Sequence, residues 1–439
     1  MKNYSLGLSL TMASVLCFAS PTMARTITVT NLADAGQGSL RAAITSANED
    51  SQADTIRFKK HLSGTIVFTS GPMDITSELM IDGPGASHMT FSGNNMHRIF
   101  NLVPKSSLSV NNVTIADGCN KRQDDLTTIT VTRGGAILND GGTLRLMRVT
   151  MRNNRTIDIE GSDVVGGGAV VNSGFATLVA SRCLFVDNVA SGGRRYAFGG
   201  AIGNVTDSVA MIDNCTFIGN EVTSGGTNYG GAIGNFGRSQ LDMIKCVFDD
   251  NTARGSGANE KAFGGAIATR PGTVDATGSM TEIDSCRFRG NRALSTTGEA
   301  NAGGGALFNE RSTLWVEWNS FLRNEAVGRN ASGGAIMATG VDGDTPLTQI
   351  NRCHFTGNMA EAGTGGLAAG GALYNTFGLM GLTQTTIDDN LADGGDDGRG
   401  LGGGLYNLGT ATADQKTRRR IVDNWASTRF DDAFGLVME

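Results

Sequence analysis

The sequence lacks an excess of positive charge. Its 36 lysine and arginine residues are outnumbered by 42 aspartate and glutamate residues, which gives a formal net charge of -6. A protein whose main partner is a nucleic acid or an anionic membrane usually presents a basic face. We therefore expect no nucleic-acid partner for this chain.

Long apolar segments are missing beyond the first 24 residues, so we expect no transmembrane anchor. The start of the chain carries Lys2, a short apolar run over residues 6–19 and small residues around Ala24. This order of features is typical of a secretory signal peptide. The sequence therefore predicts a signal peptide over residues 1–24 and an exported mature chain.

Histidine is scarce, and no catalytic constellation stands out. Of the four histidines, only His354 lies in the repeated part of the chain, where it is expected to face outward. A lyase would need a basic side chain beside charge-neutralising groups or calcium, and a glycoside hydrolase would need two facing carboxylates. The pairs Asp249–Asp250 and Asp388–Asp389 directly precede a repeated asparagine, which favours turn residues. We predict no catalytic residues.

One loop is rich in acidic residues. Asp393, Asp396 and Asp397 lie among glycines in the segment 392–399. Carboxylate oxygens are ligands that calcium prefers, so this loop is the candidate for a calcium site. Acidic loops of this kind are more often simply solvated. We therefore expect no cofactor and no metal.

Glycine, in contrast, is abundant and follows a long repeat. The 63 glycines show no period of three, which excludes a collagen-like chain. A Gly-Gly-(Ala/Gly)-(Ile/Leu/Val) motif, the glycine box, starts at residues 134, 167, 199, 230, 264, 304, 333, 370 and 402. Each unit closes on an asparagine 31 to 40 residues after the previous one: Asn154, Asn188, Asn220, Asn251, Asn291, Asn324, Asn358, Asn390 and Asn424. A repeat of this length indicates a solenoid.

The pattern within a unit predicts strands. The units hold too much glycine and too few helix formers for paired helices. Apolar residues alternate, slip by one residue and alternate again, as in Leu178, Ala180, Cys183 and Phe185, which indicates two strands joined by a turn. With the glycine box as a third strand, each unit forms one coil of an all-β, single-stranded parallel β-helix. The residues between the asparagine and the next box are predicted to form a loop.

Three positions of the repeat are predicted to stack from coil to coil, so that each forms a column of equivalent side chains. The fourth residue of the glycine box is aliphatic, the third residue before each asparagine is mostly phenylalanine, and both are predicted to face the core. Equivalent residues of stacked coils lie about 4.8 Å apart, so their side chains form ladders. We expect the asparagine ladder to satisfy backbone groups of the turn.

The beginning of the mature chain differs from the repeat. Residues 25–60 hold two β-branched strands and an amphipathic helix from Ser39 to Asn48, which predicts an N-terminal cap with one short helix. Residues 61–133 are predicted to form degenerate first coils, and residues 134–424 the repeat coils.

The end of the chain also departs from the repeat. Asp414, Lys416 and Arg419 align with core positions of earlier coils, which is typical of a polar capping coil. Residues 425–439 are predicted to form a C-terminal cap that folds over the end of the stack.

The Gly-Gly-Ala-Ile box and the closing Phe-x-x-Asn resemble the repeat of bacterial polymorphic outer-membrane proteins and similar β-helix surface proteins. The segment 26–58, with Thr-Ile-Thr-Val-Thr, Gly-Ser-Leu-Arg-Ala-Ala-Ile and Ala-Asp-Thr-Ile-Arg-Phe, resembles the N-terminal cap of many of them. The resemblance covers nearly all of the mature chain. It implies a right-handed, pectate-lyase-like β-helix that is secreted, on the cell surface or in the periplasm of a Gram-negative-type bacterium.

Six of the seven cysteines lie beyond residue 24. Cys183, Cys215, Cys246 and Cys286 occupy one core column in four successive coils, and Cys353 rejoins it two coils later. An even number of cysteines in an exported protein can indicate disulfides. Stacked coils, however, keep Cβ atoms near the coil spacing, which exceeds the ~3.8 Å that a disulfide prefers. We therefore expect buried free thiols.

One outward column is the candidate binding surface. The fifth residue of the glycine box should point away from the core, and its last four members are Phe308, Met337, Tyr374 and Tyr406. An exposed aromatic row suits an extended carbohydrate or a cell-surface protein. Coverage of the row by neighbouring loops is the alternative.

These features favour an exported, monomeric, non-enzymatic binding or adhesion-type protein. The rival class is a polysaccharide-cleaving enzyme, either a lyase or a glycoside hydrolase on a β-helix scaffold. A cluster of Asp, Arg and Lys on one outward face of three adjacent coils would favour the enzyme, whereas a bare row of aromatic residues would favour binding.

Overall fold

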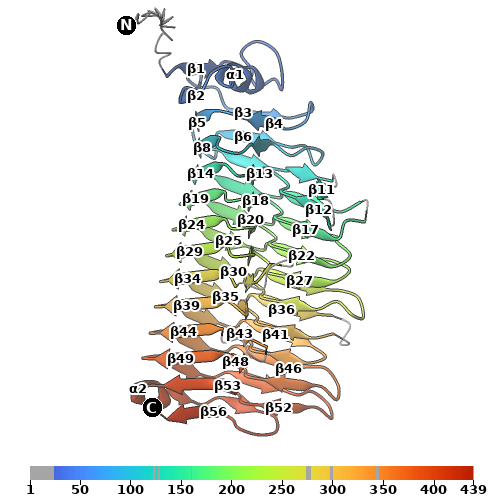
Figure 1. Ribbon diagram of the computed structural model, residues 1–439, viewed down its shortest axis with the longest axis vertical. Helices are drawn as coiled ribbons and strands as arrows, with labels where there is room; N and C mark the ends of the chain where they lie inside the picture. Colours follow the sequence, from blue (N-terminus) through green and yellow to red (C-terminus); the bar gives the residue numbers. More distant parts are fainter. Residues whose placement is uncertain are drawn as a thin grey trace, which may run out of the picture.

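The structure is a computed structural model that describes residues 24–121, 124–126, 129–159, 161–272, 278–296, 300–341 and 346–438. The chain winds into a long stack of coils, with its two ends at opposite ends of the stack (Figure 1). Repeat strands pair in parallel with their equivalents in the next coil. The predicted right-handed parallel β-helix is confirmed. The predicted signal peptide, apart from Ala24, falls outside the described residues.

One coil holds five strands, whereas the sequence predicts three. The coil that follows the box at Gly167 contains β18 (Val170–Ser173), β19 (Thr177–Ser181), β20 (Leu184–Val186), β21 (Val189–Ser191) and β22 (Tyr196–Phe198). The first three enclose the main core and match the prediction. The segment between the asparagine and the next box forms β21 and β22, so the prediction of a loop there is wrong.

The two additional strands build a side lobe, which lies on the right in Figure 1. One of its sheets runs from β10 (Cys119–Asn120) to β55 (Trp425–Ala426), and the other from β11 (Asp124–Leu126) to β52 (Arg399–Leu401). The core between these sheets consists mostly of alanines, among them Ala190 and Ala197. Strands of three residues with one buried alanine carry little hydrophobic signal, which is why the sequence pattern does not reveal them.

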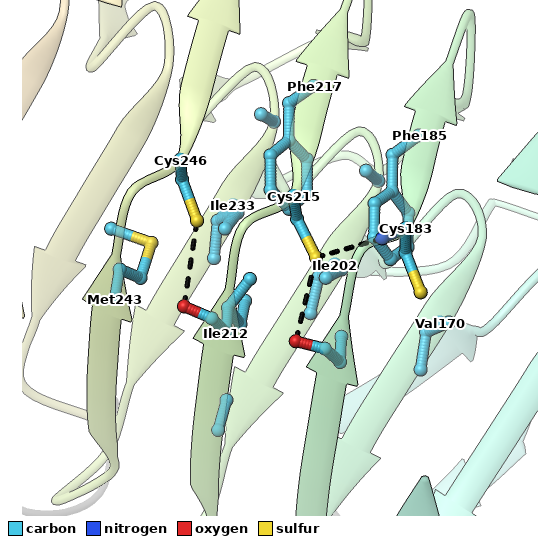
Figure 2. Packing of buried hydrophobic residues seen from close by; sticks show 14 of the residues in the cluster. Val170, Cys183, Phe185, Ile202, Ile212, Cys215, Phe217, Ile233, Met243 and Cys246 are labelled. Atoms are coloured by element: carbon cyan, nitrogen blue, oxygen red, sulfur yellow. Dashed lines mark hydrogen bonds between the residues drawn. The ribbon is translucent and has the colours of Figure 1, made fainter. Parts of the chain in front are cut away.

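The main core is built from columns of equivalent side chains, to which each coil contributes one residue. The third residue before each closing asparagine is buried, and neighbouring phenylalanine rings stack with centroids 4.6 to 4.8 Å apart along Phe185, Phe217, Phe248, Phe288, Phe321 and Phe355. The fourth residue of the glycine box is at most 1% exposed in every coil. Figure 2 shows both columns side by side, with Phe185 and Phe217 near Val170 and Ile202. Both predicted inward columns are confirmed.

The six cysteines of the described chain are buried and free, as predicted. Cys183 lies in the turn after β19, and its backbone N–H donates a hydrogen bond to Sγ of Cys215, in the equivalent turn of the next coil, at 3.3 Å (Figure 2). The Cys215 Sγ donates in turn to the Ala180 carbonyl at 3.5 Å. Burial raises the pKa of Cys353 to about 12, so that thiol stays protonated near neutral pH. The thiols therefore act as small core side chains that also satisfy turn amides.

The predicted asparagine ladder is confirmed. The fully buried Asn251 donates from Nδ2 to Oδ1 of Asn291 at 2.9 Å and to the Phe217 carbonyl at 3.0 Å. Its own Oδ1 accepts from the backbone N–H and from Nδ2 of Asn220, at 3.1 and 2.9 Å. The same side-chain bond joins each consecutive pair from Asn154 to Asn424.

A second asparagine ladder, which the sequence reading overlooks, occupies the sixth position of the glycine box. Its amides are linked from coil to coil at 2.7 to 2.9 Å through Asn139, Asn172, Asn204 and Asn235. The column is interrupted at Thr269 and Ala338. The Oδ1 atoms of Asn139, Asn309 and Asn375 have no hydrogen-bond partner in the described part of the chain. In each case the preceding coil has no asparagine at this position.

The N-terminal cap follows the prediction. After β1 (Thr26–Val29), the helix α1 (Leu40–Ala47) begins at its N-cap Ser39, whose Oγ accepts from the Ala42 N–H at 3.2 Å. The apolar face of α1 is buried against the first coils. Among the described residues, neither helix has the length and apolar character that crossing a membrane requires.

The C-terminal coil differs from the prediction. Its core positions are filled by Ala411 and Ala413 of β53 (Leu405–Ala413), so the placement of Asp414, Lys416 and Arg419 at core positions is wrong. Three additional residues between Ala413 and Ile421 shift the alignment and allow the short helix α2 (Gln415–Arg418), with Asp414 as its N-cap. The final strand β56 (Ala433–Met438) then pairs in parallel with β53.

Replacing Asn251 with alanine tests the asparagine ladder. Asn251→Ala would leave the Asn220 backbone N–H without its acceptor and would remove the amide hydrogen bonds to the Phe217 carbonyl and to Asn291 inside the core. We expect a loss of on the order of 1–3 kcal/mol in the free energy of unfolding, measured by chemical denaturation. Asn259→Ala, at an exposed asparagine without a side-chain hydrogen bond among the described residues, is the control. Equal stability of the two variants would contradict the role of the ladder.

Candidate ligand-binding groove

The predicted aromatic row lies beneath the side lobe. The fifth box position points away from the main core, but Phe308 is only 4% exposed and its ring lies 4.7 Å from that of Phe263. The prediction of an exposed row is therefore wrong at Phe308. Met337, Tyr374 and Tyr406 are half-buried, and burial raises the pKa of Tyr374. A binding role for these three residues stays a prediction.

The row belongs to a second core, in which large residues face small ones. Phe198, directly before a glycine box, fills the space above Gly203 and Gly234, where an added Cβ would lie 2.5 and 2.9 Å from its ring. In the later coils the sizes are exchanged, because Met337 fills the space at Gly303. This alternation is how two sheets reach native packing density. The residue before each box is the sequence signal that would have revealed this second core.

Arg270 packs against aromatic rings at the polar edge of the second core. Its guanidinium carbon lies 4.6 Å from the ring centroid of Tyr229 and 5.6 Å from that of Phe236. Its Nε pairs with Glu310 at 2.9 Å, so the charge is neutralised locally. Burial raises the pKa of Tyr229 to about 12. The aromatic rings of this region are thus engaged with the protein itself.

In each aspartate pair of the sequence, the second residue is a turn residue, as predicted, whereas Asp249 and Asp388 are the last residues of β30 (Val247–Asp249) and β50 (Thr386–Asp388). Asp250 and Asp389 adopt φ angles of +55° and +54° in the tight turn before the asparagine ladder. Asp249 pairs with two arginines of the next coil at 3.1 and 3.3 Å. Asp388 lies 3.1 Å from Nε2 of His354, whose side chain is exposed as predicted. Neither pair belongs to the described lining of the two grooves presented below.

In the acidic loop, the carboxylate of Asp393 makes a local hydrogen bond. Asp393 accepts a hydrogen bond from the Gly395 N–H at 3.0 Å, and Asp397 adopts a φ of +56° in the turn. Within the described ranges, no three His, Cys, Asp or Glu side chains converge in a way that could hold a metal ion. These contacts do not support the alternative of a calcium site at Asp393, Asp396 and Asp397.

A groove that the sequence reading overlooks lies on the outer face of the second strand of each coil. It has a volume of about 400 Å³ and spans five coils, through β19, β24 (Val209–Asp213), β29 (Gln240–Ile244), β34 (Met280–Asp284) and β39 (Thr313–Glu317). These strands form the left edge of the stack in Figure 1. With about 4.8 Å between coils, the groove is about 20 Å long. We call it the acidic groove.

Strand alternation and register place the side chains of the acidic groove. Leu241 and Met243 point inward, so their neighbours Asp242 and Ile244 point outward. In-register pairing then aligns Met211, Asp242, Glu282 and Trp315 in one outward column. A parallel column contains Asp213, Ile244, Asp284 and Glu317. Five carboxylates and one tryptophan therefore share a single surface groove.

Four of the five carboxylates accept hydrogen bonds from neighbouring side chains. Gln240 donates to Asp242 at 2.8 Å, Ser285 to Asp284 at 2.8 Å, and Ser181 to Asp213 at 3.1 Å. Glu317 accepts from Asn351 at 2.8 Å and from Arg352 at 3.0 Å. Glu282 has no hydrogen bond or ion pair among the described residues. It is the carboxylate most available to a ligand.

Two tryptophans mark one end of the acidic groove. Trp315 lines the groove and is 50% exposed, and Trp318 follows Glu317 in the turn, where it is 58% exposed. The Arg352 guanidinium carbon lies 4.9 Å from the Trp318 ring and also contacts Glu317, which fixes this end of the groove. Exposed tryptophan beside carboxylates is a surface suited to ligands that have both apolar faces and hydroxyl groups.

Comparison with known proteins yields no family model and no curated protein that matches the chain. Among solved structures, the chain is similar to tailspike protein 3 of bacteriophage CBA120, at 13% identity and a TM-score of 0.32. That likeness covers 91% of this chain and 56% of the tailspike chain, so the chain spans little more than half the tailspike's length.

A second similar structure is a mannuronic-acid-specific polysaccharide family 6 lyase from the human gut microbiota. It shares 9% identity at a TM-score of 0.31, over 94% of this chain and 91% of the lyase chain. At this level of similarity, neither structure carries information on activity or ligand.

Truncating Phe308 tests whether the aromatic row is core or surface. Phe308→Ala should cost about 3–5 kcal/mol in the free energy of unfolding, because it opens a cavity between the box strand and the side lobe. Trp315→Ala, at a half-exposed aromatic residue, should cost much less. Chemical denaturation of both variants makes the comparison. A Phe308→Ala protein as stable as the wild type would mean that the row is not packed as described.

Proposed function

We propose that this is an exported protein that binds an extended, uncharged glycan in the acidic groove, without cleaving it. The observation that carries the proposal is the in-register column of Trp315 and Glu282 beside Asp242 and Asp284. The signal-peptide pattern at the start of the chain supports export. The length of the groove supports a polymer as the ligand rather than a compact molecule.

The chemistry of the groove matches a sugar chain. A pyranose ring has an apolar face of C–H groups, which can lie against the exposed indole of Trp315. Its hydroxyl groups are donors, and ionised carboxylates are purely acceptors. Carboxylates about 4.8 Å apart along the groove can therefore accept hydrogen bonds from hydroxyl groups that recur along the sugar chain.

The charge of the groove restricts the class of glycan. Five carboxylates line it, and its described lining contains no lysine or arginine. A chain that carries its own carboxylates or sulfates would be repelled at close range. The same feature disfavours a lyase at this site, because such an enzyme needs a base beside groups that neutralise an acidic substrate.

Removal of the indole tests the binding site. Trp315→Ala should weaken glycan binding at least tenfold, about 1.4 kcal/mol, because the sugar loses its apolar platform. A glycan array identifies the ligand, and titration calorimetry compares the variants. Trp425→Ala is the matched control, since Trp425 is 53% exposed at the far C-terminal end of the stack. Equal loss in both variants, or array binding confined to acidic glycans, would count against the acidic groove as the site.

Hydrolysis is a second candidate function, favoured by the free Glu282. Its backbone neighbour in the adjacent coil is Asp242, so the two carboxylates project side by side from strands about 4.8 Å apart. Retaining glycoside hydrolases hold two carboxyl groups about 5–5.5 Å apart. Such an enzyme would use one carboxylate as the nucleophile and the other as the acid that protonates the leaving oxygen.

A reducing-end assay separates hydrolysis from binding. The proposal of binding without cleavage predicts no new reducing ends when the wild-type protein is incubated with its array ligand. Release that disappears in Glu282→Gln while binding persists would establish the hydrolase instead. Glu361→Gln, at an exposed glutamate of the side lobe, controls for the loss of one negative charge.

A further inference from the structure

The outer rim of the side lobe carries a second groove, which we call the rim groove. It has a volume of about 660 Å³, and the polar side chains that line it include Lys261, Arg329, Asn259, Asn301 and Asn330. Lys261 directly precedes β32 (Ala262–Phe263), and Arg329 lies between β41 (Glu325–Gly328) and β42 (Ala331–Ser332). The groove is thus built where the two sheets of the lobe connect.

The two cations of the rim groove have no anionic partner among the residues that the structure describes. The side chains of Lys261 and Arg329 form no hydrogen bond or ion pair among the described residues, and both residues are exposed. No Asp or Glu belongs to the described lining of the groove. Two cations without a carboxylate in the described lining give this groove a local positive charge.

Two of the three asparagine amides of the rim groove are held by hydrogen bonds. Asn330 donates from Nδ2 to Oδ1 of Asn301 at 3.0 Å, and its own Oδ1 accepts from the Leu367 N–H at 3.0 Å. With both oxygen atoms engaged, the amide groups present mainly N–H donors to a ligand. Amide donors and two cations together select a ligand rich in acceptors and negative charge.

We propose that the rim groove binds an anionic glycan, one whose sugars carry carboxylate or sulfate groups. Lys261 and Arg329 come from coils two apart, so their backbones lie about 10 Å from each other along the stack. They therefore contact two successive charges of an extended chain better than one small anion. The sugar hydroxyls and ring oxygens accept hydrogen bonds from the asparagine amides.

The lining of the rim groove distinguishes a glycan from other polyanions. Single-stranded nucleic acids are held mainly by bases stacked on aromatic side chains, and no aromatic residue lines the described groove. Peptide partners usually insert an aromatic or large aliphatic anchor, for which the groove offers only Ala300 as an apolar residue. A hydrophilic anionic chain needs neither feature.

The rim groove is separate from the acidic groove. The second strands of the coils, which carry the acidic groove, lie at the left of the stack in Figure 1, and the side lobe lies at the right. The two grooves also have opposite charge. The proposal for the rim groove therefore goes beyond the function proposed above and does not depend on it.

Charge removal at the rim groove tests the proposal. The double variant Lys261→Gln/Arg329→Gln should bind polygalacturonate and dextran sulfate at least tenfold more weakly than the wild type, measured by biolayer interferometry at low salt. The two polymers separate carboxylate from sulfate recognition, and uncharged dextran should not bind to this site. Lys59→Gln/Lys60→Gln is the matched control, because it removes two exposed cations from the N-terminal cap.

The outcomes are distinct. Selective loss in the rim variant, with the control variant and Trp315→Ala unchanged, supports the rim groove. Equal loss in the rim and control variants would show a net-charge effect and overturn the proposal, as would the absence of wild-type binding to both polyanions. Tighter binding of a single-stranded oligonucleotide than of either polysaccharide would assign the groove to a nucleic acid instead. Loss of neutral-glycan binding in Trp315→Ala alone bears only on the acidic groove.

Discussion

In-register stacking of one coil on the next is the constraint on which the rest of this structure depends. Parallel pairing alone satisfies the strand backbones, but every coil also has turns, where the ladder of backbone bonds is interrupted. The two asparagine ladders and the thiol column supply hydrogen bonds at these turns. Because a slip of one residue would exchange inward and outward side chains, these ladders fix which residues form the core and which reach solvent.

The side lobe shows how one coil can carry two cores. The main core is built from phenylalanine and aliphatic columns, whereas the lobe relies on alanine between its own sheets and on aromatic residues against the box strand. Large and small residues alternate between the facing sheets, as Phe198 over Gly203 and Met337 over Gly303 demonstrate. A column therefore cannot be interpreted alone, because its exposure depends on the size of the residues that face it.

This dependence explains what the sequence could and could not predict. The period, the inward columns, the asparagine ladder, the free thiols and the helix α1 follow from local alternation and spacing, and all are confirmed. The strands of the side lobe could not be predicted from the sequence, because three residues with a single buried alanine show no alternation of apolar and polar residues. Phe308 was misplaced because its cover, Phe263, comes from the preceding unit, in a segment predicted to be a loop. The three additional residues between Ala413 and Ile421 could be placed only from the strand pairing.

In a stack of this kind, the outward-facing columns are the positions that can contact a ligand. Inward positions are restricted to the few residues that pack at the coil spacing, so neighbouring coils are nearly identical there. Outward positions are free to vary, and the column through Met211, Asp242, Glu282 and Trp315 changes its chemistry at almost every step. A column that a core does not constrain and that still gathers carboxylates beside a tryptophan requires another explanation. Contact with a ligand that extends along the stack supplies one, because only a polymer samples several coils at once.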